Sequence, residues 1–198
     1  MPTKLHALPI LLAAAVIVGS IFIFTHTATA PHNGLPEGIK LINRAEDAVS
    51  LVNTKEGYSM VIPKGWKEEP ITSTQRIALY SPEALMQKTD GDLEQGCKIT
   101  TTVSTTLMTL EELQKDDPEE LELYTIEENE YSTIEVGGFK AVKNIFKAAE
   151  APFSISVSVP TNNKVYSFSM GAGEAYQKQC TEDFDKFIQT ISFLKHSP

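Results

Sequence analysis

The chain has 198 residues, of which 41% are hydrophobic and 22% are charged, and its formal net charge is −9. This is the composition of a globular protein, and a folded part of about 150 residues buries roughly 70% of its unfolded surface without needing a metal ion or a disulfide. Because an acidic surface repels phosphate groups, we expect neither nucleic acid nor anionic lipid headgroups as partners.

An uncharged apolar segment lies near the N-terminus. Residues 8–25 read LPILLAAAVIVGSIFIFT and follow a short flank, residues 1–7, that carries Lys4. About 18 apolar residues is close to the minimum for a bilayer span and exceeds a usual signal-peptide core, so the segment is predicted to be an uncleaved transmembrane anchor with the domain outside the cytoplasm. The alternative is a secreted protein that has lost residues 1–30, since residues 28–30 resemble a cleavage site.

Residues 26–47 are predicted to be a tether between membrane and domain. Two prolines and two glycines fall between positions 31 and 38, and the hydrophobic periodicity is weak, which is typical of a linker. The folded domain is therefore predicted at residues 48–195.

Most of the domain is predicted as β-strands. Segments 49–52 and 58–62 are apolar runs around a short polar stretch and read as a hairpin. A second hairpin turns at Gly137-Gly138, a dipeptide suited to the positive φ angles of a tight turn. The cleanest alternation of apolar and polar residues is at 153–159, with 165–170 as its partner. The other predicted strands are 76–80, 97–105, 131–136 and 139–146.

Three helical regions interrupt the strands. The first starts at Pro82 after Ser81, and the second starts at Thr109-Leu-Glu-Glu112, which fits a capping box, and has a further turn at Asp117-Pro118. A C-terminal helix is predicted from about Thr181, with acidic residues in its first turn and one apolar face. That face consists of Phe184, Phe187, Ile188 and Ile191. Together the elements predict an α+β sandwich, with helices packed on a largely antiparallel sheet.

Two sets of surface residues are candidates for binding a partner protein. Serines and threonines alternate along strands 97–105, 153–159 and 165–170 and give a face of small hydroxyls on which a helix or another protein can lie; coverage by the domain's own helices or by water is the alternative. Acidic residues dominate a region expected to be helical, from Thr109 to Glu130. A basic partner is one explanation of that region, and a solvated acidic surface is the simpler one.

Cys97 and Cys180 are the two cysteines of the chain. In an oxidising compartment a pair this far apart is more often bridged than free, and closing so long a loop stabilises a domain by about 4 kcal/mol in the chain-entropy model. Two buried thiols are the alternative for a cytosolic domain.

Asp90, Asp92 and Glu94 alternate in the segment TDGDLE and form the candidate metal site. Calcium prefers about six to eight oxygen ligands, and alternating carboxylates on a turn supply some of them. The segment departs from an EF-hand loop, because Gln95 stands where the glycine belongs and Thr101 where the closing glutamate belongs. A weak calcium site is therefore weighed against a solvated acidic loop, and no other cofactor is expected.

Trp66 is the only tryptophan and closes the stretch GYSMVIPKGW, residues 57–66. Pro63 cannot donate to a sheet and ends the strand, and Gly65 lets the chain bend, so Trp66 is predicted to fold back over the sheet as a core aromatic. The alternative is that Trp66 stacks on a ligand, but the stretch lacks the further aromatic and polar residues of a recognition pocket.

The histidines limit the chemistry available to the domain. All four lie outside residues 48–195, so the domain has no Ser-His or Cys-His nucleophile pair and no histidine metal ligand. No catalytic residue is assigned, and the domain is predicted not to be an enzyme. A carboxylate-based hydrolase remains the alternative if acidic residues converge in a cleft that raises their pKa values.

Three features together resemble the PsbP-like domain family: the hairpin carrying GYSMVIPKGW, a mid-chain helix after a threonine-rich strand, and the closing runs KVYSFSM and DFDKFIQTISF. The resemblance covers about residues 48–195, and bacterial members of this family are small exported or membrane-anchored proteins. It implies an α-β-α sandwich around a mainly antiparallel sheet. For the photosynthetic members it also implies an accessory role in assembling a membrane complex and retaining its ions, and it carries over no site residue.

The sequence thus predicts a non-enzymatic extracytoplasmic domain, held at the membrane by its N-terminal segment, that is an accessory or assembly factor for a membrane or envelope protein complex. A protein partner is expected. A calcium or small-molecule binding module is the alternative function.

Overall fold

The structure of the chain, a computed structural model, describes residues 35–43, 48–71, 76–86, 93–115, 124–149 and 151–194, without the side chains of residues 151 and 152. The predicted anchor at 8–25 and the predicted turn at Asp117 lie outside these residues. No helix in the described ranges has the length and hydropathy required to cross a membrane.

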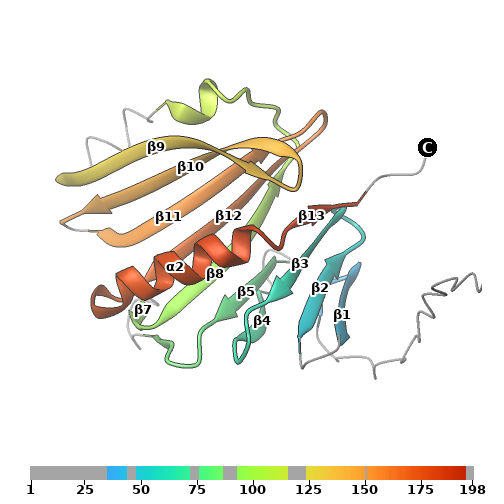
Figure 1. Cartoon of the computed structure of the whole chain (residues 1–198), viewed down its shortest axis with the longest axis horizontal. Coiled ribbons are helices and arrows are strands. Elements are labelled where there is room, and N and C mark those ends of the chain that lie inside the picture. The colour runs from blue at the N-terminus through green and yellow to red at the C-terminus, as the bar shows by residue number, and fades with distance from the viewer. Residues whose placement is uncertain are drawn as a thin grey trace, which may run out of the picture.

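A seven-stranded antiparallel sheet forms the body of the molecule (Figure 1). Its strands are, in spatial order, β4 (Lys67–Ile71), β5 (Arg76–Tyr80), β8 (Cys97–Ser104), β12 (Val165–Ala172), β11 (Ala151–Pro160), β10 (Phe139–Ala148) and β9 (Ile126–Val136). Strand β9 turns into β10 at Gly137 and Gly138, both with positive φ, which confirms the predicted hairpin. The pairing of β11 with β12 confirms the predicted partner of the alternating strand.

A second, four-stranded sheet lies beside the first. Its strands are, in spatial order, β1 (Ile39–Asn43), β2 (Val49–Asn53), β3 (Tyr58–Ile62) and β13 (Ser192–Phe193), and every pair is antiparallel. The pairing of β2 with β3 confirms the first predicted hairpin. A two-stranded ribbon joins β6 (Leu85–Met86) to β7 (Leu93–Gln95). The remaining elements are the short 3-10 helices η2 (Glu112–Gln114) and η3 (Glu174–Tyr176) and the helix α2 (Gln177–Ile188).

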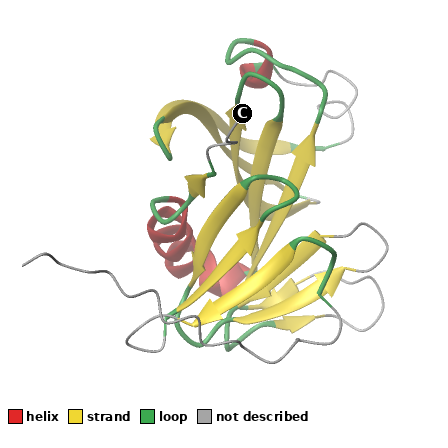
Figure 2. Cartoon of the chain, turned by 90° about the vertical axis from the view of Figure 1, so that its right-hand side faces the viewer, coloured by secondary structure: helices red, strands yellow, loops and turns green. Residues whose placement is uncertain are grey.

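The core lies between one face of the large sheet and a layer formed by the small sheet and α2. Phe168 of β12 contacts Tyr58 of β3 and Phe187 of α2, with ring centroids 6.0 and 6.3 Å apart. Phe193 of β13 contacts Tyr166 on the same face of β12, at 4.8 Å. Figure 2 shows α2 on one side of the strands. The opposite face of the large sheet is therefore left to its polar residues.

The prediction of an α-β-α sandwich is wrong. Helix α2 is the one α-helix in the described part of the chain, and the fold is mainly antiparallel β with this helix on one side. Ser81 does not cap a helix, because its Oγ accepts a hydrogen bond from the backbone N–H of Cys97 at 2.9 Å and holds a turn against β8. The capping box of Thr109 and Glu112 does form, with both reciprocal hydrogen bonds, but only the 3-10 turn η2 follows it.

Two further differences concern element boundaries. Helix α2 begins at Gln177 rather than near Thr181, so its first turn contains no acidic residue and the predicted match to the helix dipole is absent. Strand β1 lies inside the predicted tether, and Ile39 and Leu41 are buried against the core. The sequence prediction relied on the prolines and glycines of this segment. It missed the alternation of apolar and polar residues that starts immediately after Gly38.

Candidate functional site

Small hydroxyl side chains cover the face of the large sheet opposite α2. In register, Ser156 of β11 lies opposite Ser169 of β12, which lies opposite Thr100 of β8. A second row of the same kind runs parallel to it. The resulting hydroxyl face consists of Thr100, Thr102, Ser154, Ser156, Ser158, Ser167 and Ser169.

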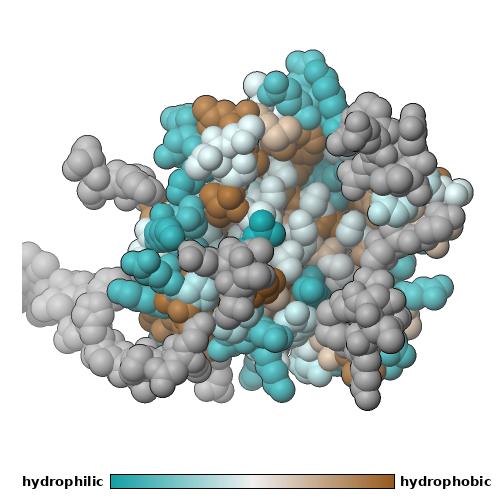
Figure 3. Space-filling model, turned by 180° about the vertical axis from the view of Figure 1, so that it is seen from behind, coloured by the Kyte–Doolittle hydropathy of each residue, from teal (hydrophilic) through white to brown (hydrophobic). Residues whose placement is uncertain are grey.

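The side chains of this hydroxyl face are half-buried. Neighbouring hydroxyls partly satisfy one another, as in the pair Ser158 Oγ and Ser167 Oγ at 3.0 Å. No α-helix of the described residues lies on the face, and η2 covers only its corner at β9 and β10, where Gln114 Nε2 donates to Thr133 Oγ1 at 3.4 Å. Figure 3 views this side of the molecule, where pale, weakly polar surface runs between brown apolar groups.

A buried acceptor borders the hydroxyl face. Asn144 of β10 pairs with Ser156 in the register, and its Oδ1 atom has no hydrogen-bond donor among the described residues. Unpaired buried acceptors of this kind are rare in folded proteins, because each costs about 1–3 kcal/mol. This unpaired acceptor lies next to Ser156 at the β10 border of the hydroxyl face, below the surface.

A pocket of about 380 Å³ lies where β3, the turn after it and the C-terminal half of α2 meet. Trp66, Phe187 and Val61 give it apolar walls, and Lys64, Asp183 and Lys186 bring charge to it. The sequence analysis did not predict this pocket, since its walls come from segments more than a hundred residues apart. The one local hint of this pocket in the sequence is the positive charge of Lys64, two residues before Trp66 in GYSMVIPKGW.

Trp66 is buried in the core, as predicted, with 9% of its surface exposed. Its backbone N–H donates to Pro63 O at 3.1 Å, and Gly65 has a φ of +82°, so the chain turns back as the sequence indicates. The same side chain also lines the pocket. The core and ligand alternatives are thus not exclusive for this residue.

The predicted calcium site is described in part. Asp90 and Asp92 lie outside the described residues, and Glu94 is exposed in β7. No group of three potential metal-ligating His, Cys, Asp or Glu residues occurs in the ranges that the structure describes. The calcium site stays a prediction.

Cys97 and Cys180 form a disulfide, which confirms the predicted bridge. Their Cα atoms are 5.6 Å apart, and the bond ties the start of β8 to the first half of α2. Both cysteines are buried, at 2% and 0% exposure. The bridge is therefore an inaccessible structural bond rather than a reactive thiol pair.

The ionisable groups with shifted pKa values do not form an acid-base pair. Burial raises the pKa of Tyr58, and also raises the pKa of Tyr80 and Tyr166. Hydrogen bonds from Thr109 lower the pKa of the exposed Glu112 carboxyl. A carboxylate general acid requires the opposite direction, a raised pKa in a cleft.

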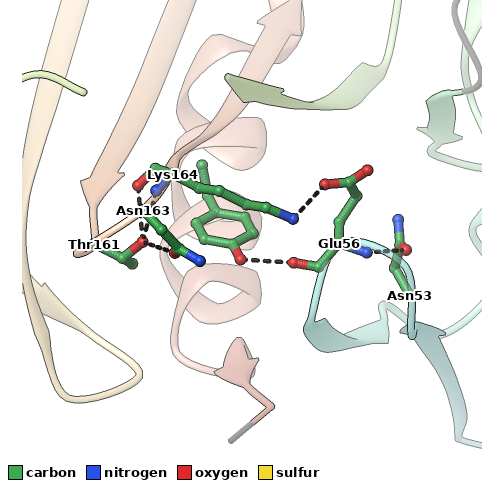
Figure 4. A network of polar contacts seen from close by, with 6 residues as sticks. Asn53, Glu56, Thr161, Asn163 and Lys164 are labelled. Atoms are coloured by element: carbon green, nitrogen blue, oxygen red, sulfur yellow. Dashed lines mark hydrogen bonds and ion pairs between the residues drawn. The ribbon is translucent and has the colours of Figure 1, made fainter. Parts of the chain in front are cut away.

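A polar network links the hairpin β2–β3 to the hairpin β11–β12 (Figure 4). Lys164 Nζ lies 2.8 Å from Glu56 Oε2, and Tyr166 donates from its hydroxyl to Glu56 O at 2.6 Å. Asn53 Oδ1 accepts from the Glu56 backbone N–H at 2.9 Å. These contacts join the large sheet to the small sheet.

The chain is similar to two solved structures. One is a cyanobacterial PsbP, CyanoP, from Synechocystis sp., with 10% identity, a TM-score of 0.47, and coverage of 83% of this chain and 97% of that chain. The other is LpqN from Mycobacterium tuberculosis, which is involved in cell envelope biogenesis, with 12% identity, a TM-score of 0.49, and coverage of 79% and 90%. No family model matches the chain, and no curated protein matches it. The first structure belongs to the family that the sequence resembles, and both similarities concern the course of the backbone.

Proposed function

We propose that this chain is a non-enzymatic accessory domain, held outside the cytoplasm by its N-terminal segment, that docks on a partner protein of the same membrane through the hydroxyl face. The observation that carries the proposal is the seven-residue hydroxyl face itself, which spans three neighbouring strands and lies opposite the side that α2 and the small sheet cover.

The chemistry of the face supports a protein partner. Small side chains let a partner's backbone or helix approach closely, and hydroxyls both donate and accept hydrogen bonds. A polar face of this kind suits a partner that contributes hydrogen bonds rather than one that binds by burying large apolar residues.

The disulfide supports a location outside the cytoplasm. Disulfides persist in oxidising compartments and are rare in the cytosol. This agrees with the predicted anchor at 8–25 and its outward orientation.

Photo-crosslinking of the full-length protein in its own membranes tests the proposal. A photoreactive amino acid at Thr102 or Ser156 should give one discrete crosslinked product, and the same probe at exposed Lys178 or Gln179 of α2 should not. Replacing Ser169 with arginine should abolish the product from Ser156, because a long charged side chain separates the two surfaces. Equal products from both sides of the molecule, or none from the hydroxyl face, would show that the face does not dock a partner.

A further inference from the structure

The pocket beside Trp66 has features of a ligand site that the docking function does not use. Its volume of about 380 Å³ falls within the range of about 300–1,000 Å³ typical of small-molecule sites. Trp66 and Phe187 give the pocket an aromatic wall.

The charge at the pocket is opposite to that of the whole chain. Lys64 and Lys186 contribute two positive charges and Asp183 one negative charge, whereas the chain carries a net charge of −9. Lys186 Nζ lies 3.5 Å from Asp183 Oδ1, so this pair is partly neutralised. No carboxylate in the described ranges forms an ion pair with Lys64, which leaves one positive charge for a ligand.

Thr190 is also a lining residue, but its hydroxyl is committed to the fold. It donates to Phe187 O at 2.8 Å and accepts from the backbone N–H of Val61 at 3.0 Å. These bonds hold the end of α2 against β3 and fix the distance between the two sides of the pocket. The specificity of the site therefore depends on the lysines and the indole.

We propose that this pocket binds a small organic anion with an apolar ring or chain. The apolar part lies against Trp66 and Phe187, and the anionic group lies near Lys64. A matched series of soluble probes separates charge from shape: 4-phenylbutyrate, 4-phenylbutanol and 4-phenylbutylamine share one apolar body and differ in the charge of the end group.

The fluorescence of Trp66 reads out binding directly, because the chain has one tryptophan. The full-length protein in phosphatidylcholine vesicles is titrated with each probe. Phenylbutyrate should change the emission in a saturable way, with an affinity at least about threefold higher than that of the alcohol and higher still than that of the amine. If the amine binds as tightly as the carboxylate, or no probe saturates, the assignment is overturned.

Variants connect the signal to the pocket. The double change Lys64→Gln and Lys186→Gln should weaken phenylbutyrate binding about five- to tenfold, while Lys178→Gln, an exposed lysine of α2 away from the pocket, should leave it unchanged. Ala48→Leu adds volume at a lining position and should remove the saturable fluorescence change. The thermal unfolding midpoint of this variant is measured to check that it still folds. Equal weakening by the Lys178→Gln control would also overturn the proposal.

A final experiment tests whether the ligand is a soluble anion or the headgroup of a lipid. Replacing phosphatidylcholine with anionic phosphatidylglycerol vesicles should not change Trp66 emission or compete with phenylbutyrate. A change of emission with the anionic vesicles would contradict a soluble ligand. These outcomes do not depend on crosslinking at the hydroxyl face, so the two proposals can fail separately.

Discussion

Gly137 and Gly138 both require a positive φ angle, but they differ in how closely other residues pack against them. Both have positive φ, +56° and +85°, in the turn between β9 and β10. A Cβ on Gly137 would lie 2.8 Å from Phe193 Cδ2, whereas a Cβ on Gly138 would meet nothing within 4 Å. The sequence predicted the turn, but the approach of β13 to it is a tertiary contact between the hairpin and the last strand.

Gly137→Ala should therefore destabilise the domain more than Gly138→Ala. Each alanine costs about 1–2 kcal/mol for the left-handed backbone, and the Gly137 variant loses a further roughly 1–3 kcal/mol from overpacking against Phe193. Urea unfolding of the two variants measures the difference. Equal losses would mean that β13 does not pack on this turn.

Tyr58 should make the domain sensitive to alkali. Burial raises the pKa of its phenol above the ordinary value of 10.0, and hydrogen bonds with Asn53 and Thr101 oppose this only in part. Since the folded state favours the neutral phenol, its contribution is fully present below pH 10.0 and is lost as the pH rises through the higher folded-state pKa. Tyr80 and Tyr166 act in the same direction.

Unfolding free energies measured from about pH 8 to about pH 11 check this. The decline above pH 10 should be shallower in Tyr58→Phe than in the parent chain. Tyr124→Phe serves as the control for the loss of a hydroxyl elsewhere. A decline of unchanged slope in Tyr58→Phe would contradict the assignment.

At the scale of elements, the two edges of the large sheet explain what the sequence analysis missed. Strand β4 reads KEEPI, and Pro70 and its charged neighbours argue against a strand in the middle of a sheet. At an edge these residues are suitable, because they discourage pairing with another chain. Strand β9 begins at Ile126 and continues through glutamates that were expected in a helix, since an edge strand tolerates charge on its exposed side.

Helix α2 packs one face into the core. Phe184, Phe187 and Ile188 are each at most 1% exposed, and Lys143 of β10 binds Asp185 at 2.6 Å. Phe184→Ala should reduce the unfolding free energy by about 3–5 kcal/mol, while Gln179→Ala on the exposed side changes it by less than about 0.5 kcal/mol. Chemical denaturation gives both values. A loss below about 1 kcal/mol at Phe184 would show that the helix is not part of the cooperative core.

At the scale of the whole molecule, the disulfide closes a loop that spans 83 residues between β8 and α2. Removing it in the double variant Cys97→Ala and Cys180→Ala should cost about 4 kcal/mol, because the unfolded chain regains the loop entropy. A reducing agent should destabilise the parent chain by a similar amount and leave the double variant unchanged. Two free thiols in the unfolded, unreduced parent would contradict the bridge.

The sequence by itself determined the local features of this protein. Apolar runs and alternation predicted the strands β2, β3, β5, β8, β11 and β12, the Gly-Gly pair predicted the β9–β10 turn, and the apolar spacing predicted α2. These features depend on residues that are neighbours in sequence, so their physics is readable from short windows. Cysteine count and spacing likewise gave the disulfide.

The alternating hydroxyls were predicted from the sequence, but only the tertiary structure decided how they align into one face and that a pocket forms beside Trp66. The hydroxyl face needs the register of three strands, and no α-helix of the described residues lies on it. The pocket needs Trp66 and Lys64 to meet Phe187 and Lys186 across more than a hundred residues. The number of helices was also a tertiary outcome, because the hydrogen bond from Cys97 N to Ser81 Oγ takes away a cap that local sequence alone predicts. Long-range contacts compete with local propensity for the same atoms, and here the long-range contacts are the stronger ones.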